Sequence, residues 1–204
     1  GRTDDLAALY AFRRSPDRVD RRAICTHFGW DPAKPLVALY ASNWFDWPHQ
    51  LGMRNFRDFL DWIEVSFAAA RANGAVNWLF KPHPAEDWFG GIGLAEIMRR
   101  VGAAPNVGVS SKAWNNAAVM ESIDALVTYH GTAGIELAAQ GKPVMLPDRG
   151  KYHGAGFAQV ADSRADYVAR LSGEWWRNWD AETARRRAEI YAGWWFCTTD
   201  WQGG

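Results

Sequence analysis

The chain has 204 residues, of which 48% are hydrophobic and 23% are charged, a composition that supports a folded domain with a sizeable core. Lys plus Arg and Asp plus Glu are equal at 23 each, which argues against a broadly basic surface for nucleic acid. Cys25 and Cys197 form no pairing motif, and no apolar run is long enough to cross a bilayer. We therefore expect a cytoplasmic protein, and the missing initial methionine suggests a fragment of a longer one.

Strands and helices alternate along most of the chain. Residues 1–34 are expected to form a helical lead-in. Short apolar runs predict five strands, at 35–42, 75–80, 106–111, 125–130 and 143–147. Helical spacing of apolar residues predicts helices at 56–74, ending on Gly74, and at 93–103, 115–123, 132–141, 163–173 and 181–196. This alternation predicts an α/β fold, a Rossmann-like doubly wound parallel sheet over 35–173 with helices on both faces, followed by a Trp-rich helical segment over 174–204.

Histidines gather at the ends of the predicted strands. His49, His83, His130 and His153 each follow a predicted strand, whereas His27 lies elsewhere. Ligands of a doubly wound sheet bind beyond the carboxyl ends of its strands. The clustering therefore indicates a ligand site at that edge.

The stretch Lys81-Pro82-His83-Pro84 places one imidazole between two prolines at the end of a strand. Because proline fixes its own backbone angle and restricts the residue before it, we expect His83 to be held rigidly. Two interpretations compete. Either His83 contacts a ligand at this edge while Lys81 adds a point charge, or His83 caps a turn and Lys81 is solvated. We favour the first.

A second candidate site opens the helix predicted at 132–141. Unpaired amides and the helix dipole favour an anion at such a position, and small residues let a phosphate approach the backbone. A carboxylate about one turn into the helix suits a ribose diol, although simple capping explains the same pattern. The residues concerned are His130, Gly131, Thr132, Ala133, Gly134 and Glu136. The glycine patterns of dinucleotide-binding folds and P-loop kinases are missing.

Two weaker candidates lie in neighbouring loops. Asn43 and Asp46 follow the first predicted strand, where they would contact a ligand at this edge or else form an Asx-turn. Lys151, Tyr152 and His153 lie in a glycine-rich stretch after the fifth strand. That stretch is predicted to be either a mobile loop over the ligand or an ordinary surface loop.

Glu86 near several histidines suggests a metal site. The sequence lacks the short His-x-x-x-His spacing of zinc sites and the Asp-x-Asp motif of metal-dependent transferases. We therefore expect neither a metal nor a resident cofactor.

Several stretches together resemble a known family: "ASNWFDWPHQLG", "LFKPHPAE", "SIDALVTYHGTAGIELAAQGKPVML" and "KYHGAGFA". From about Pro35 to Leu171 the chain resembles the C-terminal half of bacterial capsule and surface-polysaccharide biosynthesis proteins. These are two-domain glycosyltransferases of the GT-B type, related to the capsular Kdo transferases.

The resemblance implies a role for each motif. The C-terminal domain of such enzymes holds a nucleotide-sugar donor, here CMP- or UDP-linked. His83 would stabilise charge on the leaving nucleotide, Thr132 and the amides near Gly131 would bind the same phosphate, and Glu136 would lie nearer the ribose. We expect the loops of His83 and Thr132 to converge on that phosphate from strands about 5 Å apart.

The resemblance also implies that a partner domain is missing. The acceptor, a glycan or a lipid-linked glycan, is bound by an N-terminal domain that has no counterpart here, so we expect the isolated chain to be inactive. Such enzymes work in the cytoplasm or at the inner face of the membrane. The 13 tryptophans fit this expectation, because some of those near the C-terminus would cover the missing domain. The candidates are Trp175, Trp176, Trp179, Trp194, Trp195 and Trp201.

Two other function classes remain open from the sequence. A sugar-nucleotide epimerase of similar architecture would bind a uridine nucleotide without an acceptor polymer. A non-catalytic domain of this fold would only dock in an assembly complex.

Overall fold

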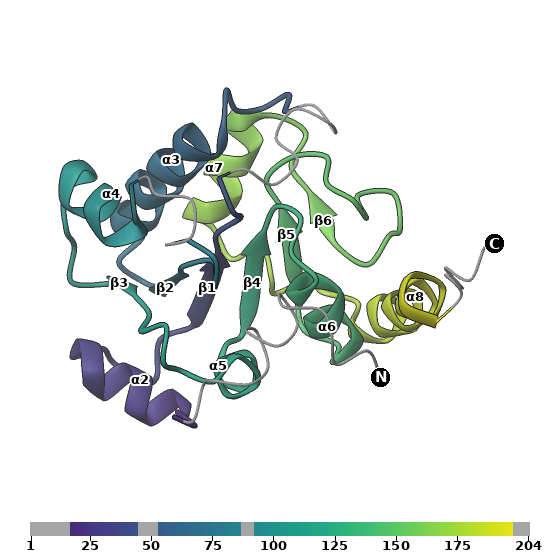
Figure 1. Cartoon of the computed structure of the whole chain (residues 1–204), viewed down its shortest axis with the longest axis horizontal. Coiled ribbons are helices and arrows are strands. Elements are labelled where there is room, and N and C mark those ends of the chain that lie inside the picture. Colours follow the sequence, from purple (N-terminus) through teal and green to yellow (C-terminus); the bar gives the residue numbers. More distant parts are fainter. Residues whose placement is uncertain (1–16, 45–52, 87–91, 198–204) are drawn as a thin grey trace.

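The computed structural model describes residues 17–44, 53–86 and 92–197. Within these ranges six strands form one all-parallel sheet in the order β3-β2-β1-β4-β5-β6 (Figure 1). The strands are β1 (Leu36–Tyr40), β2 (Asn77–Lys81), β3 (Val107–Val109), β4 (Ala125–Thr128), β5 (Val144–Leu146) and β6 (Gln159–Val160). The predicted doubly wound parallel sheet is confirmed.

The helices lie between and after the strands, as predicted. They are α2 (Arg21–Phe28), α3 (Phe59–Ala72), α4 (Leu94–Val101), α5 (Asn116–Ser122), α6 (Ala133–Ala139), α7 (Arg164–Ser172) and α8 (Ala181–Ala192). A short π-helical turn, η1 (Gly193–Cys197), continues α8. The helix expected near the start of the chain, before residue 17, lies outside the described residues.

Two differences from the predicted elements have local causes. Helix α3 begins at Phe59 because the Asp58 carboxylate accepts a hydrogen bond from the backbone of Asp61, and it ends before Asn73 rather than at Gly74. Strand β6 was not predicted. It has only two residues, both half-buried, so it shows no hydrophobic pattern long enough to detect.

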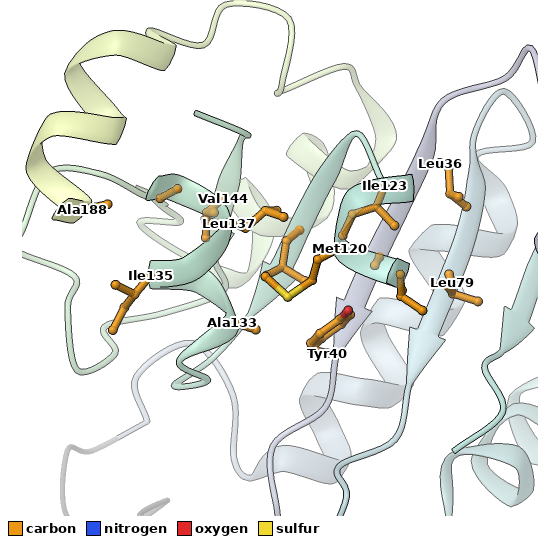
Figure 2. Packing of buried hydrophobic residues seen from close by; sticks show 14 of the residues in the cluster. Leu36, Tyr40, Leu79, Met120, Ile123, Ala133, Ile135, Leu137, Val144 and Ala188 are labelled. Carbon is orange, nitrogen blue, oxygen red and sulfur yellow. The ribbon is translucent and has the colours of Figure 1, made fainter. Parts of the chain in front are cut away.

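The sheet separates two hydrophobic cores. Helices α3, α4 and α7 cover one face, and α2, α5, α6 and α8 cover the other (Figure 1). Every residue of β1 is buried, and its side chains alternate, with Val37 and Leu39 in the first core and Ala38 and Tyr40 in the second. Figure 2 shows the second core, where Leu137 of α6 and Ile123 pack beside the strands. Burial on both faces explains the continuous apolar run of the strand sequence.

Strand β1 lies at the point where the strand order reverses. It pairs with β2 on one side and with β4 on the other. The loops that carry His83 and Thr132 follow β2 and β4, so they are not neighbours, and two strand spacings, or about 10 Å, separate the strands. The expectation that adjacent strands carry them was wrong. A diphosphate spans such a gap more easily than a single phosphate does.

The C-terminal tryptophans differ in exposure. Trp194 is 57% exposed and Trp195 36%, whereas Trp175, Trp176 and Trp179 are partly buried against the two cores. Trp201 lies outside the described residues. No helix in the described part of the chain is long and apolar enough to span a membrane.

Candidate functional site

His83 is held in a turn at the carboxyl end of β2. Its Nδ1 accepts a hydrogen bond of 3.1 Å from the backbone of Ala85, and its carbonyl accepts one of 3.0 Å from the backbone of Glu86. Because Nδ1 is an acceptor, the proton of the neutral imidazole sits on Nε2. The ring is half-buried. The structure therefore shows the turn role of His83, and its contact with a phosphate stays a prediction.

Lys81 is the last residue of β2 and is buried, with 8% of its surface exposed. Burial lowers the pKa of its ammonium group. Its Nζ lies 5.8 Å from the ring centroid of Tyr40, and within the described ranges it makes no ion pair or hydrogen bond. The side chain is thus not the solvated lysine of the alternative interpretation.

Glu86 has a structural role in the described part of the chain. Its carboxylate accepts a hydrogen bond of 3.1 Å from the backbone of Leu94 at the start of α4, and it pairs with Lys112 at 3.2 Å. It therefore links the end of β2 to α4 and to the loop after β3. Among the described residues, no three His, Cys, Asp or Glu side chains are grouped so as to hold a metal ion.

The loop after β4 leads directly into α6. Thr132 occupies the N-cap position, but its side chain does not cap the helix, and the residue is exposed. Neither the Thr132 nor the Ala133 backbone N–H bonds to another described residue. Two amides and a hydroxyl are therefore available together at this helix start, which suits an anion.

Tyr152 supports this loop from inside the protein. The side chain is 2% exposed, and its hydroxyl donates a hydrogen bond of 2.9 Å to the Gly131 carbonyl. A β-carbon on Gly134 would lie 2.0 Å from the same hydroxyl, so only glycine fits there. Tyr152 thus positions the α6 loop, and its direct contact with a ligand stays a prediction.

The stretch containing Lys151 and His153 is anchored beside Tyr152. The rings of Tyr152 and Phe157 are both buried and stack with their centroids 5.1 Å apart. The His153 backbone N–H donates to the Gly150 carbonyl at 3.2 Å. These contacts fit an ordered surface loop better than a mobile one.

His130 lies buried between β4 and the Gly131 loop. Burial, with a smaller contribution from the Lys151 charge, lowers the pKa of its imidazole to about 4, against an opposing effect of Asp148. The ring is therefore neutral at neutral pH. Its Nδ1 is buried without a hydrogen-bond partner in the described part of the chain.

Glu136 and Asn43 lie at the same edge of the sheet. Glu136 is half-buried one turn into α6. Burial raises the pKa of the Tyr40 phenol, and the Glu136 charge contributes to the same rise. Asn43 follows β1 and is 8% exposed. Asp46, the other candidate in that loop, lies outside the described residues.

Sequence reasoning missed Tyr40, Ser110 and Asp148. Tyr40 and Ser110 end up at the rim of the sheet with buried hydroxyls that have no hydrogen-bond partner in the described ranges. Both look like ordinary strand residues in the sequence. Asp148 lies two residues after the end of β5, and a charged residue after an apolar strand was a usable signal.

Solved structures share this fold, although no protein-family model and no curated protein matches the sequence. KpsC of Thermosulfurimonas dismutans, a β-Kdo 2,4 transferase, is 20% identical with a TM-score of 0.51 over 70% of this chain and 45% of that chain. MnaA of S. aureus, solved with UDP, is 12% identical with a TM-score of 0.54 over 87% of this chain and 49% of that one.

Sucrose-phosphate synthase from Thermosynechococcus elongatus is 14% identical, with a TM-score of 0.56 over 88% of this chain and 48% of that chain. The chain therefore spans about half the length of each of these three structures. At these identities the likeness establishes the fold: this chain has the Rossmann-like α/β architecture found in half of each of these proteins.

Proposed function

We propose that this chain is the donor-binding half of a two-domain glycosyltransferase of the GT-B type that acts in capsular or surface polysaccharide biosynthesis. The observation that carries the proposal is the placement of polar groups around the carboxyl end of β1. His83 follows β2, and the Thr132 hydroxyl and the Thr132 and Ala133 backbone N–H groups follow β4. Ligands of doubly wound sheets bind at this point of strand-order reversal.

The ligand proposed for this end of the sheet is a CMP- or UDP-linked sugar. Because β1 separates β2 from β4, a diphosphate would reach both His83 and the α6 loop more easily than a monophosphate would. Glu136, which has no ion pair among the described residues, would accept hydrogen bonds from the ribose. Charge that develops on the leaving phosphate would be stabilised by these donors.

The catalytic cycle requires more than this chain. The proposed acceptor, a glycan or a lipid-linked glycan, would be held by a second domain, so the isolated chain is expected to bind nucleotide but to transfer no sugar. We propose that the whole enzyme works in the cytoplasm, at the inner face of the membrane. Sugar transfer to an acceptor glycan by the isolated chain would contradict the division into two halves.

Calorimetric titration of UDP, UMP, CDP, CMP, uridine and cytidine tests the donor site. His83→Ala and Thr132→Ala should each weaken nucleotide binding by about 1–3 kcal/mol, the value of a hydrogen bond to a charged group, and should leave nucleoside binding nearly unchanged. His153→Ala, a surface histidine on a neighbouring loop, is the matched control and should change neither. Unchanged nucleotide affinity in His83→Ala would show that His83 only forms a turn.

The same titration separates the other function classes. A cytidine preference favours a Kdo-type donor, and a uridine preference leaves a hexose transferase or an epimerase. Absence of nucleotide binding favours a docking domain.

A further inference from the structure

Four polar side chains lie side by side across the end of the sheet. The strand register pairs Tyr40 of β1 with Lys81 of β2 and with Thr128 of β4. Ser110 comes next after the Val109–Phe80 pair, and its backbone bonds to Phe80 at 2.8 Å, so it lies beside Lys81. We call these four residues the rim row. They share the face of the sheet that α5 and α6 cover.

The rim row is buried but poorly satisfied. Ser110, Lys81, Tyr40 and Thr128 are 4%, 8%, 8% and 1% exposed. The hydroxyls of Ser110 and Tyr40 have no hydrogen-bond partner in the described ranges, and the same is true of the nearby Asn116 Oδ1 on α5. A buried polar group left without a partner destabilises the folded chain, and a buried charge without a partner does so more strongly.

The groups of the rim row are complementary to a negatively charged partner. Nζ of Lys81 lies 5.8 Å from the centroid of the Tyr40 ring, and no described carboxylate pairs with it. A buried ammonium group beside two buried hydroxyl donors suits an oxyanion.

The rim row lies deeper than the loops that carry His83 and Thr132. Figure 2 shows Tyr40 with Met120 of α5 and Ala133 of α6 beside it. Thr132, by contrast, is exposed, and His83 is half-buried. An anionic group held by the row would therefore be enclosed between the sheet and these two helices.

We propose that Lys81, Tyr40 and Ser110 form a buried oxyanion subsite at the rim of the sheet, separate from the donors on His83 and the α6 loop. The subsite takes a phosphate or a carboxylate of the ligand. The proposal rests on the proposed donor cleft only for the identity of that ligand.

Thermal unfolding with inorganic phosphate, with D-glucuronate and with glucose tests the subsite, at constant ionic strength. Phosphate or glucuronate should stabilise the wild-type chain, with a dissociation constant that rises at least tenfold in Lys81→Met and about threefold in Tyr40→Phe. Glucose, which carries no charge, should have no effect. Stabilisation by phosphate alone identifies a nucleotide phosphate as the occupant, and stabilisation by glucuronate identifies a sugar carboxylate.

A matched lysine at the opposite edge of the sheet provides the control. Nζ of Lys142 donates to the carbonyls of Met120, Glu121 and Ile123 at 2.8, 2.8 and 2.9 Å. Lys142→Met should lower the melting temperature without ligand and keep the response to the anion. Lys81→Met should raise the melting temperature without ligand and lose that response, because it removes an uncompensated buried charge.

The outcomes separate this subsite from the proposed function. If Lys81→Met abolishes the anion response while no nucleotide binds the wild type, the subsite stands and the donor-site proposal fails. If only His83→Ala abolishes the response, the anion binds at His83 and the subsite is wrong. The subsite is also wrong if neither anion stabilises the wild type, or if Lys81→Met destabilises the unliganded chain as Lys142→Met does.

Discussion

The two edges of the sheet differ in whether their buried polar groups have hydrogen-bond partners. At the edge where the strands begin, Arg21 bonds to Asp124 at 2.9 Å and to the Lys34 carbonyl at 2.7 Å, and Asp124 also accepts from the backbone of Leu36 at 2.7 Å. At the edge where the strands end, hydroxyls of Tyr40 and Ser110 are buried with no partner in the described residues. Within the described residues, the polar groups of the first edge are paired by the chain itself, whereas the second edge retains buried hydroxyls without partners.

We propose that the presence or absence of hydrogen-bond partners distinguishes structural polar groups from ligand-binding ones, and that the size of a nearby cavity does not. A surface groove of about 570 Å³ lies at the first edge, lined by residues that include Arg21, Asp124 and Lys142. The charged side chains of these three residues all bond within the protein. A buried polar group without a partner costs stability, so its retention indicates a function that stability does not explain.

Asp148 tests this comparison of the two edges with the largest expected effect. It lies at the edge where the strands end, but its carboxylate has hydrogen-bond partners. Its carboxylate accepts hydrogen bonds from the backbones of Arg54 and Asn55 at 2.6 and 2.8 Å and from the Tyr129 hydroxyl at 2.9 Å. Asp148→Ala should lower the free energy of unfolding by about 3–5 kcal/mol, the cost of breaking a buried charged network. Urea denaturation measures this.

The matched control for Asp148 is Glu189→Ala, which removes an exposed carboxylate from α8. It should change the free energy of unfolding by less than about 0.5 kcal/mol. If Asp148→Ala were as mild as this control, satisfaction by hydrogen bonds would not distinguish structural from ligand-binding groups at this edge.

The sequence predicts the fold better than it predicts the site. Apolar strand runs and helical spacing placed five of the six strands, because burial on both faces leaves a pattern that a single chain shows. The loops of His83 and Thr132 were identified, since strand ends are recognisable. The rim row was not, because the placement of Tyr40 beside Lys81 and Ser110 depends on strand order and register. Those arise from contacts between distant parts of the chain.

His130 is expected to make stability depend on pH. Burial lowers the pKa of its imidazole from 6.5 to about 4. Between these two pKa values the unfolded chain binds more protons than the folded chain. The free energy of unfolding therefore rises with pH in this range and decreases as the pH falls. His130→Gln should reduce the loss between pH 6.5 and 4 by about 2–3 kcal/mol, since each pKa unit corresponds to 1.36 kcal/mol.

Urea denaturation at several pH values between 4 and 6.5 measures the free energy of unfolding of the wild type and of His130→Gln. Subtracting one from the other removes the contribution of the carboxylates, which titrate in both proteins. The exposed His153 serves as control, and His153→Gln should keep the wild-type pH dependence. An identical pH dependence in wild type and His130→Gln would show that His130 titrates as a solvated histidine.

Two buried serines offer the same substitution with opposite expected signs. The hydroxyl of Ser66 on α3 donates to the Trp62 carbonyl at 2.7 Å and contacts the Tyr167 hydroxyl at 2.7 Å, whereas that of Ser110 has no partner among the described residues. Ser66→Ala should cost about 1 kcal/mol of unfolding free energy. Ser110→Ala should be neutral or slightly stabilising without ligand. Equal losses in the two variants would mean that Ser110 is satisfied, for example by buried water.

Tyr152 has features of both classes of polar group. Its hydroxyl has a hydrogen-bond partner within the chain, but it supports a loop that the ligand is proposed to contact. Its hydroxyl donates to the Gly131 carbonyl at 2.9 Å, and the ring stacks on Phe157. Tyr152→Phe keeps the stacking and removes only the hydrogen bond, so the free energy of unfolding should fall by about 0.5–1.5 kcal/mol.

The effect of Tyr152→Phe on binding should be smaller than that of Thr132→Ala, since Tyr152 acts on the ligand only through the position of the α6 loop. We expect a twofold to threefold loss of nucleotide affinity in calorimetry, with nucleoside affinity unchanged. Tyr191→Phe is the control. The Tyr191 hydroxyl donates to the Lys151 carbonyl at 3.3 Å on the surface, so its removal should affect neither quantity measurably. A loss of affinity in Tyr152→Phe as large as that in Thr132→Ala would show that the Tyr152 hydroxyl contacts the ligand. Tyr152 would then belong with the ligand-binding groups.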